Sequence, residues 1–229
     1  MKCKILWSGI TGNTGKMMQK VIGKRDDVVL AGGICRSSSD FFSYEKIDDI
    51  KPIFDVLVDF SHPEHFDKLL QLALKYKKPF VVGTSGLSDE QMHALEDAAK
   101  IIPVFKGGNF RFLVKTFIDE IVSLAKNSLD EEIILEETHY KSMHLPSQTA
   151  LVIKKRVEEE TGKKLIIKST TQDIFFTNQW CVQNVSFSCP VYDENLVNNI
   201  LSIAFIMCSK KADGIYDLDR LYALNVIDR

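Results

Sequence analysis

The 229-residue sequence has no excess of charge of either sign, no long hydrophobic run and no secretion signal. Its 29 basic and 31 acidic residues are interspersed and give a net charge of -2, which argues against nucleic acid as a partner. The longest apolar stretch, near residues 200–208, is too short to cross a bilayer. We therefore expect a soluble protein that binds neither nucleic acid nor membranes.

The five cysteines, at positions 3, 35, 181, 189 and 208, form no C-x-x-C motif. Several lie in apolar stretches, where they would act as small buried hydrophobic residues. We therefore expect a reducing, cytoplasmic location and no metal site. With 45% hydrophobic residues and no repeat or low-complexity linker, the chain can form one large domain or two small ones.

Residues 4–15 combine an apolar run with three glycines, Gly9, Gly12 and Gly15, and a helix-like stretch follows. This order predicts a strand, a tight turn and a helix. Such a turn lets the backbone approach a pyrophosphate, while the first amides of the helix face the anion. The G-x-x-G-x-x-G spacing differs by one residue from the common G-x-G-x-x-G motif, so a turn without a ligand is the alternative.

Further strands are predicted at residues 28–34, 55–60, 79–82 and 101–105, and they alternate with helices, which indicates a parallel sheet with crossover helices. Ligands of such sheets bind beyond the carboxyl ends of the strands. We therefore predict that the strand ends form one dinucleotide site, with these cofactor-binding residues: Gly9, Ile10, Thr11, Gly12, Asn13, Thr14, Gly15, Cys35, Arg36, Phe60, Gly83, Thr84, Ser85, Gly107, Gly108, Asn109 and Phe110.

The end of the second strand carries Cys35 and Arg36 where a carboxylate would bind both ribose hydroxyls of NAD. An arginine at this place accommodates a 2′-phosphate. The cofactor is therefore predicted to be NADPH or NADH, and Arg36 favours NADPH.

The pattern changes after a helix predicted at residues 112–126. Residues 131–138 alternate weakly, residues 146–160 form an amphipathic helix pattern, and strand patterns follow up to residue 188. This predicts an α+β segment with a mixed or antiparallel sheet. A helical pattern resumes near residue 193.

Six segments in order resemble the 4-hydroxy-tetrahydrodipicolinate reductase (dihydrodipicolinate reductase) family. They are the glycine turn, Val58-Asp-Phe-Ser-His-Pro-Glu64, Gly83-Thr-Ser-Gly86, Gly108-Asn-Phe110, Pro146-Ser-Gln-Thr-Ala150 and Gly214-Ile-Tyr-Asp-Leu218. The resemblance implies an α/β fold, with a Rossmann-like dinucleotide-binding domain (1–110 plus 193–229) and a central α+β substrate-binding and oligomerisation domain (111–192). It also implies a homo-oligomer, usually a tetramer.

The family transfers a hydride from a nicotinamide to a cyclic dicarboxylate. The resemblance therefore implies an NAD(P)H-dependent oxidoreductase of lysine (diaminopimelate) biosynthesis, with a small-molecule dicarboxylate as its substrate. Two alternatives stay open: a reductase of another small imine or enamine dicarboxylate, and a non-catalytic NAD(P)-binding module.

The family motif His-His-x-x-Lys-x-Asp-Ala-Pro-Ser-Gly-Thr-Ala is altered here. Aligned on Pro146, the first His is replaced by Thr138 and the Lys by Ser142, whereas His139 keeps its place. Either His139 and Lys141 supply the proton donor and a cation for a carboxylate, or the family reaction is slow or lost. His139 and Lys141 are the predicted catalytic residues.

Carboxylate binding is predicted for His139, Gln148 and Thr149, of which Gln148 replaces the family's Gly. Arg111 and Lys115 place cations at the start of the helix near residue 112, where either could contact a carboxylate. Lys115 is therefore added to the predicted substrate-binding residues. The sequence after Ser169 lacks glycine-rich segments of the family, so the second domain is shortened.

Overall fold

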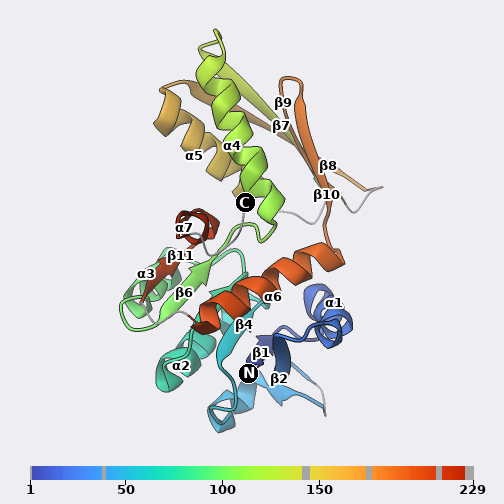
Figure 1. Ribbon diagram of the computed structural model, residues 1–229, viewed down its shortest axis with the longest axis vertical. Helices are drawn as coiled ribbons and strands as arrows, with labels where there is room; N and C mark the ends of the chain where they lie inside the picture. The colour runs from blue at the N-terminus through green and yellow to red at the C-terminus, as the bar shows by residue number, and fades with distance from the viewer. Residues whose placement is uncertain (1, 38–39, 141–144, 174–176, 210–212, 225–229) are drawn as a thin grey trace. The chain divides into compact units, whose positions relative to one another are not determined.

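The computed structural model describes residues 2–37, 40–140, 145–173, 177–209 and 213–224 (Figure 1). The chain divides into two compact units. Unit 1 contains residues 1–110 and 194–229, and unit 2 contains residues 111–193. The cofactor-binding role of unit 1 and the substrate-binding and oligomerisation role of unit 2 stay predictions.

A seven-stranded parallel sheet forms the centre of unit 1, in the order β11-β6-β5-β4-β1-β2-β3. The chain runs outward in one direction from β1 to β3 and then returns to start β4 on the other side of β1. This reversal creates a point at which loops separate at the carboxyl ends of β1 and β4, the usual ligand position in such sheets. The strands are β1 (Cys3–Ser8), β2 (Val28–Cys35), β3 (Phe42–Ser43), β4 (Val56–Asp59), β5 (Phe80–Val82), β6 (Pro103–Lys106) and β11 (Gly214–Tyr216).

Helices cover both faces of this sheet, so its central strands are apolar on both sides. On one face, α6 (Glu194–Ser209) contacts β1, β4, β5 and β6 and packs beside α1 (Asn13–Val21) (Figure 1). The other face is covered by α2 (Phe66–Tyr76), α3 (Asp89–Ala98) and the short helix η2 (Tyr44–Asp49), which share one apolar core with the strands. Two further short helices, η1 (Ile22–Lys24) and η3 (Pro63–His65), precede β2 and α2, and α7 (Leu218–Ala223) follows β11.

The turn between β1 and α1 needs glycine at two positions. Gly9 has φ +80°, and a Cβ there would lie 2.2 Å from the carbonyl oxygen of Phe60. At Gly15, a Cβ would lie 2.4 Å from the carbonyl oxygen of Ile10. The two glycines therefore let the first turn of α1 pack directly onto the end of β1.

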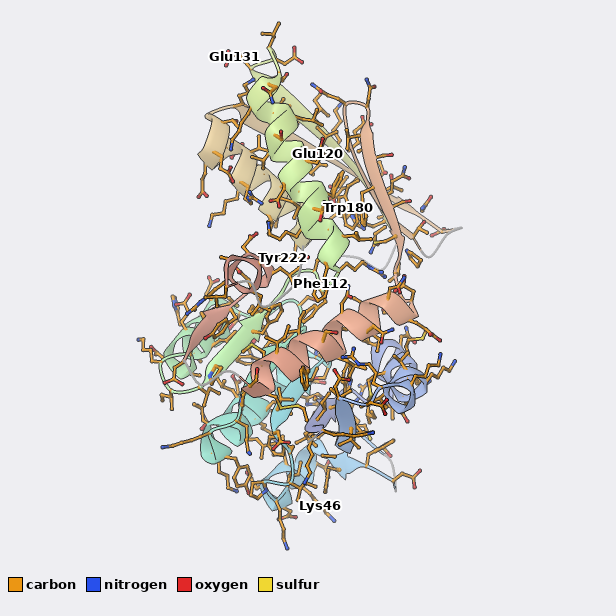
Figure 2. The ribbon with its side chains drawn as sticks, in the orientation of Figure 1. Lys46, Phe112, Glu120, Glu131, Trp180 and Tyr222 are labelled. Carbon is orange, nitrogen blue, oxygen red and sulfur yellow. A yellow bond between two sulfur atoms is a disulfide. The ribbon has the colours of Figure 1, made fainter. Side chains whose placement is uncertain are left out.

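Unit 2 has a four-stranded mixed sheet in the order β10-β9-β7-β8, with α4 (Phe112–Asn127) and α5 (Gln148–Thr161) packed together on one face (Figure 1). The strands are β7 (Glu132–Tyr140), β8 (Lys164–Gln172), β9 (Thr177–Val182) and β10 (Val185–Pro190), and only β7 and β8 are parallel. Alternate residues point into the core, among them Ile133 and Leu135 on β7. The buried Trp180 of β9 belongs to this core and is labelled in Figure 2.

The predicted fold class is confirmed: a parallel α/β sheet is followed by an α+β segment with a mixed sheet. Two pieces were not predicted. The β3–η2 segment has no periodic pattern, and β11 is only three residues long, although it adds a parallel strand next to β6.

Two of the five cysteines form a bridge that was not predicted from the sequence. Cys3 at the start of β1 and Cys208 near the end of α6 form a disulfide, while Cys35, Cys181 and Cys189 are free. A bridge between residues 205 positions apart leaves no spacing signal in the sequence.

Replacing Gly15 by alanine should destabilise unit 1 by about 1–3 kcal/mol, because the added methyl group collides with backbone atoms that cannot move freely. Gly23→Ala is the matched control, since a Cβ there meets nothing within 4 Å. Urea unfolding of both variants measures the difference in free energy. Equal stabilities for the two variants would contradict the tight packing of α1 on β1.

Candidate functional site

A cavity of ≈ 490 Å³ opens at the carboxyl ends of β1, β2 and β4 in unit 1. It brings together six of the predicted cofactor residues: Gly9, Thr11, Gly12, Cys35, Arg36 and Phe60. Five more residues line it: Tyr44, Ser61, His62, Glu64 and His65. Ser61, His62 and Glu64 belong to the segment 58–64 that carries the family resemblance, whereas Tyr44 and His65 were not singled out in the sequence. The cavity thus lies at the place that the strand order predicts for a ligand.

The glycine turn forms one wall of this cavity. Gly12 is the N-cap of α1, has extended backbone angles and is exposed, and no side chain caps the helix. Asn13 and Thr14 begin the helix, so their backbone N–H groups belong to the first turn, which has no partner within the helix. Ile10 differs from its neighbours, because its side chain is fully buried and packs under the turn against Gly33. The wall fits a pyrophosphate group.

Tyr44 of η2 holds the turn from the opposite side. Its hydroxyl oxygen accepts a hydrogen bond from the Gly9 backbone N–H at 3.1 Å and lies 2.9 Å from the Ser8 hydroxyl. The Tyr44 ring stacks on His65, with centroids 3.6 Å apart. Sequence reasoning missed Tyr44 because the segment before it shows no regular pattern.

Arg36 is exposed at the rim of the cavity, and two histidines share its surroundings. Burial lowers the pKa of His65, although Glu64, 3.3 Å away, acts in the opposite direction. His65 is therefore mostly neutral at pH 7. Arg36 is the permanent cation among the residues that line the cavity.

The last residue of β4 is a buried carboxylate, which connects the loops that follow β4 and β5. Asp59 is fully buried and accepts hydrogen bonds from the Ser61 hydroxyl (2.6 Å), the Ser61 N–H (3.1 Å) and the Thr84 hydroxyl (2.7 Å). Burial raises the pKa of Asp59, and these hydrogen bonds oppose the rise. Lys106 Nζ donates to the Thr84 carbonyl oxygen at 3.0 Å. The predicted residue Thr84 thus has a structural partner on each side.

Three aromatic rings, those of Trp7, Phe60 and Phe110, pack together at the carboxyl ends of these strands. Phe60 stacks on Trp7 (centroids 5.5 Å apart) and lies 4.9 Å from the ring of Phe110. At Gly83, a Cβ would collide with the Phe60 ring at 2.3 Å, so glycine is required there. Phe110 is buried and Gly108 is exposed. Ser85, Gly107 and Asn109 lie in the same loops but do not line the cavity.

Unit 2 contains a second buried carboxylate, Glu137 on β7, with partners on β7 itself, at the start of α5 and on β8. We call Glu137, His139, Ser147 and Ser169 the Glu137 cluster. Its oxygens accept hydrogen bonds from His139 Nε2 (2.8 Å), the Ser147 hydroxyl (2.6 Å), the Ser147 N–H (3.0 Å) and the Ser169 hydroxyl (2.6 Å). Trp180 Nε1 donates to the Ser147 hydroxyl at 3.2 Å. Ser147 is also the N-cap of α5 and accepts from the Ala150 N–H. The Glu137 cluster therefore fixes where α5 begins.

His139, a predicted catalytic residue, lies inside this cluster. Its side chain is fully buried, and its second ring nitrogen, Nδ1, is 2.9 Å from Asn178 Oδ1. Burial would lower the pKa of His139, but the hydrogen bonds to Glu137 and Asn178 raise it. Burial would likewise raise the pKa of Glu137, but hydrogen bonds from His139 and the two serines lower it to about 2. Both ring nitrogens thus face acceptors, as in an imidazolium paired with a carboxylate.

The other predicted substrate residues lie nearby in the chain. Gln148 is exposed and Thr149 is buried in the first turn of α5. Lys115 Nζ forms an ion pair with Asp119 at 2.6 Å on α4. Arg111, at the N-cap of α4, is buried and contacts both carboxylate oxygens of Asp193 at 2.9 Å. Lys141 and Ser142 lie outside the described residues.

None of the helices that the structure describes has the length and the apolar composition needed to cross a membrane.

Solved structures of very different sequence share the fold. A dipicolinate-bound dihydrodipicolinate reductase from Paenisporosarcina sp. TG-14 matches with a TM-score of 0.68 at 15% identity, over 95% of this chain and 98% of that one. An aspartate dehydrogenase from Thermotoga maritima matches with a TM-score of 0.54 at 13% identity, over 89% and 95% of the two chains. Together with the strand order and the glycine turn, these matches define the fold of unit 1 as a Rossmann-type dinucleotide-binding fold.

Residues 3–110 match the sequence model of the family "Dihydrodipicolinate reductase, N-terminus". The chain is 30% identical over 168 residues to the 4-hydroxy-tetrahydrodipicolinate reductase of Caldanaerobacter subterraneus and 33% identical over 164 residues to that of Zymomonas mobilis. These alignments cover 72% and 71% of this chain. The chain is thus similar to the 4-hydroxy-tetrahydrodipicolinate reductases over most of its own length. It spans 66% and 64% of the lengths of these two relatives, just under two thirds.

Replacing His139 by glutamine should destabilise unit 2 by about 3–5 kcal/mol, because it leaves the buried Glu137 carboxylate without its cationic partner. His93→Gln, on the exposed surface of α3, is the control and should change the unfolding free energy by less than about 0.5 kcal/mol. Chemical unfolding followed by tryptophan fluorescence measures both, because Trp7 lies in unit 1 and Trp180 in unit 2. A change of less than about 1 kcal/mol for His139→Gln would contradict the assigned ion pair.

The same pair predicts how stability depends on pH. The folded-state pKa of His139 is raised, so its contribution is complete below its ordinary value of 6.5 and is lost as pH rises through the folded value. The pKa of Glu137 falls from 4.5 to about 2, so its contribution, about 3 kcal/mol, is lost as pH falls from 4.5 towards 2. The unfolding free energy of unit 2 should therefore be highest between pH 4.5 and pH 6.5, the ordinary pKa values of the two groups. His139→Gln should remove the decrease on the alkaline side.

Proposed function

We propose that this chain is an NAD(P)H-dependent reductase of 4-hydroxy-tetrahydrodipicolinate in the diaminopimelate route to lysine. The observation that carries the proposal is the cavity at the carboxyl ends of β1, β2 and β4, built from the glycine turn in a chain similar to this family. Its relatives of known name are reductases of this compound. The bound nicotinamide supplies the hydride.

The residues of unit 1 fit a dinucleotide. Gly9 and Gly15 let the backbone of the turn come close to the end of β1, and the exposed Gly12 carries no side chain that would cover the first amides of α1. These amides would bind the pyrophosphate. Phe60 would contact the cofactor from the end of β4, where it lines the cavity.

We infer a preference for NADPH from Arg36. No carboxylate stands at the end of β2 to bind two ribose hydroxyls, whereas the guanidinium of Arg36 can form paired hydrogen bonds with a 2′-phosphate. Glu64 also lines the cavity, and its carboxylate lies 3.3 Å from His65 and 3.8 Å from His62, so Arg36 supplies the positive charge that attracts a phosphate.

In unit 2 we propose that a substrate carboxylate binds at the first turn of α5, where Gln148 and Thr149 lie. Lys115 would add a positive charge to this site. A helix N-terminus stabilises negative charge. The Glu137 cluster sets the position of this turn through Ser147. His139 would then act by positioning α5, since both of its ring nitrogens are engaged. Lys141 stays a proposed catalytic residue.

We also propose that the protein works as a homo-oligomer, a tetramer by its resemblance to the family, in the cytoplasm. In a reducing compartment the Cys3–Cys208 pair would be present as two thiols.

The proposal is tested by mixing the protein with freshly prepared 4-hydroxy-tetrahydrodipicolinate and NADPH or NADH and following the loss of nicotinamide absorbance. We expect turnover with a kcat of about 1 per second or more. Cofactor binding without turnover of this substrate, but with turnover of another cyclic imine dicarboxylate, would move the assignment to that substrate. Binding without any turnover would indicate a non-catalytic nucleotide-binding protein.

Arg36→Ala should weaken NADPH binding by about tenfold, because a charge-assisted hydrogen bond at an exposed site is worth about 1.4 kcal/mol. NADH binding should change by less than about twofold, since NADH has no 2′-phosphate. Titrations that follow the fluorescence of the bound dihydronicotinamide measure both constants, and Lys20→Ala, on the exposed end of α1, controls for loss of surface charge. An equal loss of affinity for NADPH and NADH would show that Arg36 does not contact the 2′-phosphate.

A further inference from the structure

Lys106 lies at an unusual place for a lysine, the last residue of β6 at the carboxyl edge of the sheet in unit 1. In the strand register, Asp59 of β4 pairs with Val82 of β5, and Val82 pairs with Lys106. Asp59 and Lys106 thus stand at the same level, two strands apart. They also share a sheet face with the buried Leu57 and Val104, because alternate residues of a strand point to the same side.

Lys106 stands at the part of the sheet edge that lies away from the place expected for the adenosine half of the dinucleotide. The cavity lies at the ends of β1, β2 and β4, around the point where the strand order reverses, and Arg36 stands on its β2 side. A dinucleotide crosses the sheet edge at that point, so its nicotinamide half reaches the ends of β4, β5 and β6. Lys106 belongs to this second half.

The contacts of Lys106 hold its ammonium group but leave donors for a ligand. Nζ donates to the Thr84 carbonyl oxygen at 3.0 Å, and the Thr84 hydroxyl in turn donates to Asp59 Oδ2 at 2.7 Å. An ammonium group has three N–H donors. Within the described part of the chain, no carboxylate oxygen lies within 4.0 Å of Nζ.

Its surroundings make Lys106 a group that can release a proton. Burial lowers the pKa of the ammonium, and the negative charge of Asp59 opposes this effect. The other elements packed against β6 add little charge: β11 contributes the buried Tyr216, and the acidic Glu194 at the start of α6 is paired with Lys24. A lysine in this environment is a common proton donor or acceptor in enzymes.

We propose that Lys106 donates the proton in the reduction that this chain catalyses, at the nicotinamide end of the cofactor site. The proposal rests on the proposed function, and it goes beyond it by giving the donor role to unit 1. It also accounts for the altered motif in unit 2, where Thr138 and Ser142 stand at the positions of the family's proton-transfer residues.

The step is balanced as follows. The ring of 4-hydroxy-tetrahydrodipicolinate first loses its hydroxyl group as water, which leaves an additional double bond. A carbon of that double bond gains the hydride, and the C–H bond at C4 of the dihydronicotinamide breaks, so the substrate gains two electrons and the cofactor loses them. The electron pair of the substrate double bond moves to the neighbouring carbon or nitrogen atom, which forms a bond to a proton of Lys106. The N–H bond of the ammonium breaks, and the neutral amine then takes a proton from water.

The first experiment compares Lys106→Met and Lys106→Arg with the wild-type protein in the reductase assay. Arginine keeps the positive charge and can donate to the Thr84 carbonyl, but it does not release a proton. Both variants should lose about 100-fold in kcat, with cofactor affinity changed by less than about threefold. The wild-type kcat should fall as pH rises through the pKa of Lys106, and this decrease should be absent in Lys106→Met, where added methylamine should restore part of the rate.

Lys100→Met, on an exposed lysine before β6, is the matched control and should leave kcat unchanged. Full activity of Lys106→Arg would show that only the charge matters and would overturn the proposal. So would a loss of kcat in Lys106→Met that follows an equal loss of cofactor affinity.

A second experiment does not depend on turnover. The fluorescence of bound NADPH, measured between about pH 6 and 10, should change in the wild-type protein as Lys106 loses its charge, and should be constant in both Lys106 variants. A pH-independent signal in the wild type would overturn the placement of Lys106 beside the nicotinamide. If this titration is seen while 4-hydroxy-tetrahydrodipicolinate is not reduced, the proposed substrate is wrong and the position of Lys106 is supported.

Discussion

A buried carboxylate must receive enough hydrogen bonds to replace the water that it has lost, and each unit of this protein is organised around one that does. In unit 1, Asp59 at the end of β4 draws in the loop after its own strand through Ser61 and the loop after β5 through Thr84. In unit 2, Glu137 near the end of β7 connects the start of α5 with β8 through Ser147 and Ser169. The loops that carry the candidate site are therefore placed by the donors that these two carboxylates require.

The two carboxylates differ in the charge of their donors. Asp59 receives hydrogen bonds from neutral groups, and burial raises its pKa. Glu137 also has a cationic donor in His139, and its pKa falls to about 2. The Glu137 cluster is thus a fixed structural ion pair, whereas the charge at Asp59 is held more weakly and depends on what lies nearby. Lys106 lies close enough for the two groups to influence each other.

The sequence predicted those features that depend on local order or on strand alternation. The three glycines identified the first turn, and the alternation of strands and helices identified the parallel sheet. It did not show the partners of Glu137, because Ser147 and Ser169 are 10 and 32 residues away and no periodicity connects them. One signal was present: Glu137 continues the inward-facing series of Ile133 and Leu135, as Lys106 continues that of Val104. A charged residue at an inward position of a strand marks a buried polar site even before its partners are known.

The contacts of the Glu137 cluster explain how some residues of the family motif can change while the backbone around them stays the same. His139 and Ser147 both belong to the Glu137 cluster, so replacing either would expose a buried charge to an apolar core and disturb α5. Thr138 carries no such constraint, because its hydroxyl lies 2.9 Å from the Thr170 hydroxyl, whereas His139, Ser147 and Ser169 supply the side-chain donors to Glu137. Residues that fix the backbone are therefore retained, and residues that only supply a proton can change once another group near the reacting atoms can give one. Lys106, the half-buried lysine that we propose as the proton donor, meets that chemical requirement.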